Sequence, residues 1–204
     1  NKFQLLRDLA ATKIALAGRQ IEDLINLPEM TDADTLAAMR MILSVIPAAY
    51  FAVPELLPMI GFKLVSLSVK HGNAPASAYG YAGYGFILCE LGDIDSGYRF
   101  GKLALRVLEW FNVRELKART VFVVNTLIRH RKEHIRETLS PLLQAYQNGL
   151  EIGDLEYAAL SAYVYSRYSN SIGRDLIELE QEMTSYSEII GQLKQETIHN
   201  YHNI

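Results

Sequence analysis

One short stretch of the sequence matches a known metal-binding signature. Residues 130–134 read H-R-K-E-H, which fits the H-x-x-E-H pattern of one class of zinc peptidases. In that chemistry His130 and His134 would bind zinc, and Glu133 would act on the metal-bound water. Such a site needs both histidines on one face of a continuous helix and a third ligand from elsewhere. A zinc hydrolase is therefore one hypothesis, and a charged turn between two helices is the other.

A glycine-rich stretch invites a second chemical interpretation. Gly80, Gly83 and Gly85 form G-x-x-G-x-G, which is similar to a reversed nucleotide-binding loop. A phosphate cradle requires a strand before the loop and a helix start after it, and neither is indicated here. The chain also has no G-x-x-x-x-G-K-[ST] motif. The pattern favours close helix packing over nucleotide binding, and no cofactor is expected.

Tyrosines gather in two parts of the chain. A tyrosine combines a large apolar ring with a polar hydroxyl, so these residues could line a concave face that binds a peptide or a small effector. The other interpretation is that they pack between helices. The candidates for an interaction surface are Tyr79, Tyr81, Tyr84, Tyr98, Tyr157 and Tyr163.

An acidic segment lies near the C-terminal end of the sequence. Glu178 and Glu182 are four residues apart, so they share a helix face and repel each other mildly. We expect a solvated face here, with no acid–base chemistry.

Composition narrows the function classes. The 204 residues are 50% hydrophobic and carry a net charge of −3, which argues against a nucleic-acid surface. Cys89 is the only cysteine, so no disulfide forms within the chain. The most apolar run, 41–54, is shorter than the roughly 20 residues that span a bilayer. We expect a cytoplasmic protein without membrane contact, and a chain that begins at Asn1 because it is a piece of a longer protein.

The elements that would position these residues follow a regular spacing. Turn-forming residues recur near 32, 53, 73, 93, 113, 153 and 173, a step of about twenty, with one position missing near 133. Between them the apolar residues are spaced three and four apart, which is typical of helices. The sequence predicts an all-α fold of about nine antiparallel helices forming an α-α superhelix, or solenoid; a single closed helical bundle is the alternative. The missing position falls on H-R-K-E-H, which favours a helix–helix turn there.

The segment 81–105 resembles the tetratricopeptide (TPR) pattern. Tyr81 stands at its opening aromatic position, Gly92 and Asp93 form the turn, and small residues occupy the helix contacts. These predicted packing positions are Gly85, Gly97 and Ala104. The departures from the pattern are Tyr84, Leu88, Gly101 and Glu109, so the segment is TPR-like with a longer repeat.

Several phrases together resemble one protein family over nearly the whole chain. They include "LINLPEMTDADTLAAMRMILSVIPAAYFAVPELLPMIGFKLVSLSVKHGNAPASAYGYAGYG", "HRKEHIRETLSPLLQAYQNGLEIGDLEYAA" and "LKQETIHNYHNI". The family is the large multidomain bacterial signalling proteins that combine a serine/threonine kinase, an AAA-type ATPase, a helical repeat region, a GAF domain and a histidine kinase. The resemblance places this chain in the helical repeat region.

The resemblance implies a role without chemistry of its own. The sequence contains no H-R-D, D-F-G or Walker A motif, so no catalytic residue is carried over. We expect a single TPR-like repeat domain over 1–204, with 192–204 leading into the next domain. It would act as a scaffold for contacts with proteins or neighbouring domains. An effector- or peptide-sensing domain is the alternative, and a zinc hydrolase is a remote one.

Overall fold

The structure is a computed structural model that describes residues 2–192, and helices joined by turns and short irregular stretches make up this part of the chain. None of the described residues forms a β-strand; the only β-type backbone pairing among them is an isolated bridge between Glu29 and Asn73. The all-α prediction is confirmed. The predicted passage into a next domain, at 192–204, lies outside the described residues except for Gln192.

Contacts divide the chain into two compact units, which we call the N-terminal unit (Asn1–Leu116) and the C-terminal unit (Lys117–Ile204). A single repeat domain over the whole chain stays a prediction.

The N-terminal unit contains six α-helices and two short 3₁₀ turns. They are α1 (Lys2–Leu16), η1 (Ile21–Asn26), α2 (Ala33–Ser44), α3 (Ile46–Ala52), η2 (Pro54–Leu56), α4 (Leu57–His71), α5 (Pro75–Glu90) and α6 (Ile94–Phe111).

Most of these helices begin and end where the turn-forming residues predict. Asp32 caps α2 by accepting a hydrogen bond from the Thr35 backbone N–H at 2.7 Å, and Asp93 caps α6 in the same way. Asn112 ends α6 in the left-handed conformation, with φ of 48°. The twenty-residue spacing therefore marks real helix boundaries.

Two further boundaries escape that spacing, and the second of them raises the number of α-helices in the described residues to ten, where about nine were expected. The first segment breaks after Leu16, at a turn that includes Gly18. The apolar run 41–54 breaks at Val45, because Pro47 lies in the first turn of α3, where its missing N–H is not needed.

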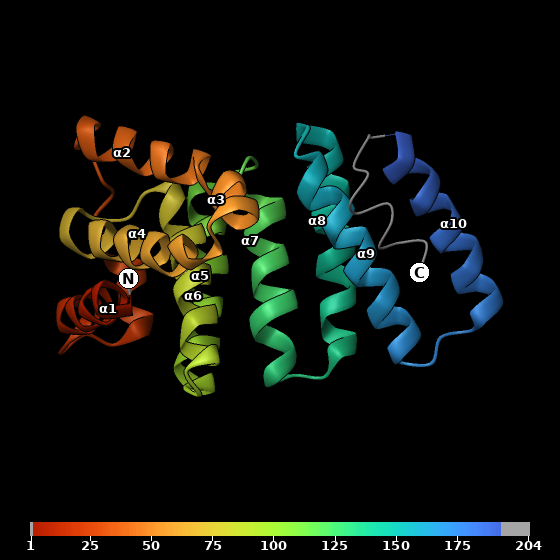
Figure 1. Ribbon diagram of the computed structural model, residues 1–204, viewed down its shortest axis with the longest axis horizontal. Helices are drawn as coiled ribbons and strands as arrows, with labels where there is room; N and C mark the ends of the chain where they lie inside the picture. Colours follow the sequence, from red (N-terminus) through yellow and green to blue (C-terminus); the bar gives the residue numbers. More distant parts are fainter. Residues whose placement is uncertain (1, 193–204) are drawn as a thin grey trace. The chain divides into compact units, whose positions relative to one another are not determined.

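The centre of the N-terminal unit is α5, which packs against both α4 and α6 (Figure 1). Its buried residues point in every direction around the helix, from Ala76 and Ala78 to Leu88 and Cys89. A helix that is apolar on all sides must be covered on all sides. This explains why the sequence 75–89 contains no charged residue.

A buried polar link ties the start of this unit to the turn between α4 and α5. Asn73 is fully buried, and its side chain donates to the Leu24 carbonyl and accepts from the Tyr81 hydroxyl, both at 2.8 Å. The Asn73 backbone also exchanges hydrogen bonds with Pro28 and Met30. Because buried polar groups are costly unless paired, this network fixes the segment 24–30 against the core.

The C-terminal unit contains four α-helices and an irregular connection. Its elements are α7 (Lys117–Val123), the π-helical turn η3 (Val124–Ile128), the 3₁₀ turns η4 (Arg129–Arg131) and η5 (Ile135–Thr138), α8 (Leu139–Ile152), α9 (Leu155–Ser171) and α10 (Leu176–Gln192).

Each α-helix of the C-terminal unit packs against the next along the chain (Figure 1). The helices α8 and α9 lie close together at Gly149, where an added Cβ would lie 3.0 Å from the Ala158 nitrogen. Around it Tyr146, Ala158, Ala159 and Ala162 form a core cluster onto which Tyr186 of α10 packs.

Candidate functional site

The H-R-K-E-H segment does not form a continuous helix. The chain passes from the π-helical turn η3 into the 3₁₀ turn η4, leaves helical structure at 132–134, and enters η5 before α8. The prediction of a helix–helix turn is confirmed. His130 lies in η4, and His134 lies within the break as the residue that caps η5, so the helix face that a zinc peptidase requires does not exist here.

The side chains of this segment are engaged in other contacts. Glu133 accepts a hydrogen bond from Arg129 at 2.6 Å, and the His134 Nδ1 accepts from the Arg136 backbone N–H at 3.1 Å. His130 is half-buried against Tyr168, and its buried Nδ1 has no hydrogen-bond partner among the described residues. Burial, and secondarily Arg131, lowers the pKa of His130. No group of three or more His, Cys, Asp or Glu within 2–192 is placed to hold a metal ion, so we do not propose a zinc hydrolase.

The glycine-rich stretch lies in the middle of α5, where its backbone N–H groups belong to the helix. A Cβ added at Gly80 would lie 2.7 Å from the Leu64 Cβ of α4. A Cβ at Gly97 of α6 would lie 2.6 Å from the Gly85 carbonyl oxygen. Ala104, the other predicted small position of α6, is fully buried. These positions serve helix packing, and the structure offers no phosphate loop here.

Two of the predicted surface tyrosines lie in the core. Tyr81 is 0% exposed and Tyr84 is 2% exposed, so neither contributes to a protein-binding surface. Both rings pack against Phe100 of α6. The physical reason is that α5 is covered on all sides, as the absence of charged residues from 75 to 89 indicates.

The other four candidate tyrosines are half-buried, and three of them stack with cations. The Lys102 ammonium lies 5.6 Å from the ring centre of Tyr98, and the guanidinium groups of Arg119 and Arg167 lie over Tyr157 and Tyr163. Tyr79 and Tyr98 belong to the N-terminal unit; Tyr157 and Tyr163 belong to the C-terminal unit. These four residues remain candidates for contact surfaces, within one unit or the other.

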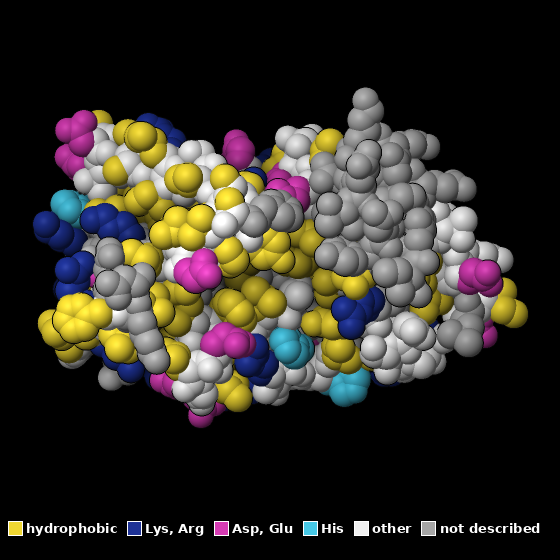
Figure 2. Space-filling view, viewed as in Figure 1, with side chains coloured by type: hydrophobic (Ala, Val, Ile, Leu, Met, Phe, Trp, Pro, Cys, Tyr) yellow, Lys and Arg dark blue, Asp and Glu magenta, His cyan; other side chains and the backbone are white. Residues whose placement is uncertain are grey.

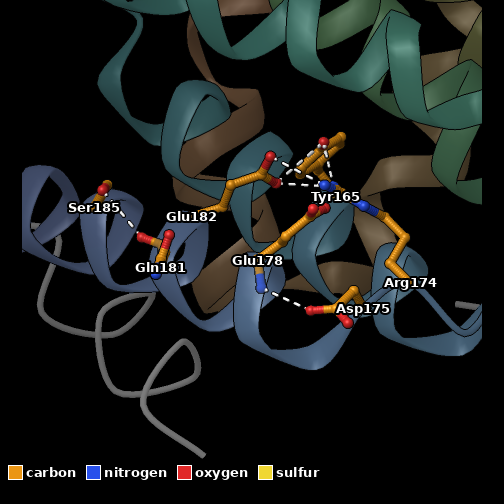
Figure 3. A network of polar contacts seen from close by, with 7 residues as sticks. All are labelled: Tyr165, Arg174, Asp175, Glu178, Gln181, Glu182 and Ser185. Atoms are coloured by element: carbon orange, nitrogen blue, oxygen red, sulfur yellow. Dashed lines mark hydrogen bonds and ion pairs between the residues drawn. The ribbon is translucent and has the colours of Figure 1, made fainter.

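The acidic segment contains an ion-pair network that the sequence analysis missed. Arg174, in the turn after α9, points toward both Tyr165 and Glu182 (Figure 3). Its guanidinium donates to both carboxylate oxygens of Glu182, at 2.8 and 3.1 Å, and to the Tyr165 hydroxyl at 2.9 Å. The hydrogen bond from Arg174 lowers the pKa of Glu182. Glu182 therefore holds α10 to α9, whereas a purely solvated face was expected.

An uncovered apolar stretch is the clearest candidate for an interaction surface. Five large hydrophobic side chains between 41 and 56 are 42–70% exposed: Met41, Val45, Tyr50, Val53 and Leu56. We call this stretch the apolar segment 41–56; it runs from the end of α2 through α3 and η2. Figure 2 shows hydrophobic side chains gathered over α2 and α3. Exposed apolar surface of this kind often marks an interaction site.

The described residues thus define an all-helical protein whose chemically suggestive motifs are used for packing and turns. None of its described helices combines the length and the apolar character needed to cross a bilayer. Comparisons with protein-family models, with curated proteins and with solved structures find no match for this chain.

Proposed function

We propose that this chain is a non-catalytic helical module that binds proteins, or neighbouring domains of its own chain, through the apolar segment 41–56. The observation that carries the proposal is the exposure of Met41, Val45 and Tyr50 in a run, 41–54, without a charged residue. Burying such side chains against a partner gains roughly 25 cal/mol per Å² of apolar area.

The architecture we propose is a TPR-like α-α superhelix. Two observations support it: helix boundaries recur at about twenty residues, and small side chains bring consecutive helices close at Gly97 and Gly149. Modules of this kind act through their surfaces and need no cofactor.

The resemblance to multidomain kinase and ATPase proteins supports a cytoplasmic role in signal transduction. The coding sequence on either side of this chain tests that part of the proposal. Kinase and ATPase motifs in the flanking regions are the expected result, and an open reading frame without them would remove the signalling role but leave the contact module standing.

Site-specific photo-crosslinking in cells tests the contact module. A photoreactive amino acid replaces Met41 in one sample and Ile177 in the other, because both side chains are about 70% exposed and apolar. We expect crosslinks to defined peptides of a partner or neighbouring domain from position 41, and loss of these when Val45→Asp is added. Equal, diffuse crosslinking from both positions would contradict the proposal.

A further inference from the structure

A cleft in the N-terminal unit has features that packing alone does not account for. Its volume is about 190 Å³, and it opens between the α1–η1 segment on one side and α5–α6 on the other. Leu24, Leu88 and Phe100 contribute apolar surface to it. A cavity of about 150 Å³ is large enough to hold benzene, so this cleft has room for an organic molecule of roughly ten non-hydrogen atoms.

Tyr84 lines this cleft and is the first unusual feature. The side chain is 2% exposed, and its hydroxyl has no hydrogen-bond partner among the described residues. Its neighbour in α5, Tyr81, is equally buried but donates to Asn73 at 2.8 Å. The Tyr84 hydroxyl makes no hydrogen bond within the described residues, so it is available to donate to a group that enters the cleft.

The charges around the cleft are the second feature. Lys13 and Arg19 line one side, and neither forms an ion pair with the described residues. Asp93 lines the other side, where it already accepts the capping hydrogen bond from the Ser96 N–H at 3.1 Å. Two cations and one carboxylate leave a net charge of +1, which matches a monoanion.

The protonation state of Tyr84 fits a donor role. Burial, and secondarily the Asp93 carboxylate, raises the pKa of Tyr84 to about 12. The hydroxyl is therefore protonated near neutral pH and available to donate.

We propose that this cleft binds a small organic monocarboxylate with an apolar body. Lys13 and Arg19 pair with the carboxylate, the body lies on Leu88 and Phe100, and the Tyr84 hydroxyl donates to the ligand. An uncharged apolar molecule would gain nothing from these two exposed cations. The proposal is independent of the apolar segment 41–56 and goes beyond a role in protein contacts.

An NMR titration of the ¹⁵N-labelled chain tests the proposal directly. The probes are phenylacetate and 4-methylpentanoate, with phenylacetamide as the uncharged analogue of the first. We expect saturable shifts of the Tyr84, Leu88 and Phe100 amides with at least one carboxylate, and affinity at least about fivefold weaker for phenylacetamide, because it lacks the charge. Absence of these shifts with both carboxylates at about 20 mM would overturn the proposal, since such binding would be weaker than any useful affinity.

Substitutions separate a binding role from a structural one. Arg19→Gln should raise the Kd for the carboxylate about fivefold or more, whereas Lys63→Gln, on the exposed part of α4 outside the cleft, should leave it unchanged. Tyr84→Phe should raise the Kd without lowering the melting temperature of the free protein, because no protein hydrogen bond is lost. Unchanged affinity in Arg19→Gln would overturn the assignment of the carboxylate to this cleft.

Discussion

Gly97 and Gly83 show, at the scale of single residues, how surroundings decide the effect of one methyl group. A Cβ at Gly97 would lie 2.6 Å from the Gly85 carbonyl oxygen, whereas a Cβ at Gly83 would meet nothing within 4 Å. We expect Gly97→Ala to destabilise the protein by about 1–3 kcal/mol through overpacking, and Gly83→Ala to stabilise it by about 0.5–1 kcal/mol through helix propensity. Urea denaturation measures both, and equal effects would contradict the close approach of α5 and α6.

Tyr81 and Tyr84 form a second matched pair at this scale. Tyr81→Phe removes the donor to the buried Asn73 Oδ1, so we expect a loss of about 1–3 kcal/mol in the free energy of unfolding. Tyr84→Phe removes a hydroxyl that has no partner among the described residues, so its effect on the free protein should be near zero. Thermal unfolding of the two variants provides the measurement; a reversed order would show that the Asn73 link does not stabilise the core.

His130 should make the stability of the C-terminal unit depend on pH. Its pKa in the folded state lies below the ordinary value of 6.5, so the unfolded chain binds a proton first as the pH falls. Stability from the neutral imidazole is complete above about pH 6.5 and is lost as the pH falls through the folded-state pKa. Chemical denaturation between pH 7 and 5 should show this decline, and His130→Asn should flatten it. His134→Asn should keep it; a decline that persists in His130→Asn would exclude His130 as its origin.

At the scale of elements, α10 depends on the contacts that Arg174 and Glu182 make with α9. Arg174→Lys keeps the charge but loses the bidentate hydrogen bond to Glu182. Because the pair is partly exposed, we expect the free energy of unfolding to fall by only about 0.5–1 kcal/mol. Hydrogen exchange should show faster exchange in α10 and unchanged protection in α5 and α6. Uniform acceleration across the chain would mean that α10 unfolds only together with the rest.

The two compact units make a prediction at the scale of the whole molecule. Arg114, Glu115 and Lys117, around the boundary between the units, are exposed and lie outside or at the start of a helix. Limited trypsin digestion should therefore cut first at Arg114 or Lys117. Residues 1–116, produced alone, should unfold cooperatively, because the hydrogen bonds of Asn73 and the packing of α5 against α4 and α6 lie within that unit. Initial cleavage elsewhere, or a fragment without a cooperative transition, would contradict this division.

The sequence by itself determined the helical class and most helix boundaries. These follow from local chemistry: Asp32 and Asp93 cap helices, Asn112 adopts the left-handed conformation, and apolar residues recur at helical spacing. It also placed H-R-K-E-H in a turn. Pro47 indicates a helix start close to Val45, but the twenty-residue spacing does not include this boundary.

Only the tertiary structure decided which residues are available for function. Tyr81 and Tyr84 are the same residue type as Tyr98, yet α4 and α6 bury both rings and leave Tyr98 half-buried; of the two buried tyrosines, only Tyr84 lines the cleft. The sequence around Glu182 does not distinguish it from a surface glutamate, but in the folded chain it pairs with Arg174. Lys13 and Asp93 are 80 positions apart in the sequence, and folding brings them to the same cleft. Burial and pairing depend on residues far apart in the chain, and local sequence patterns carry no information about those partners.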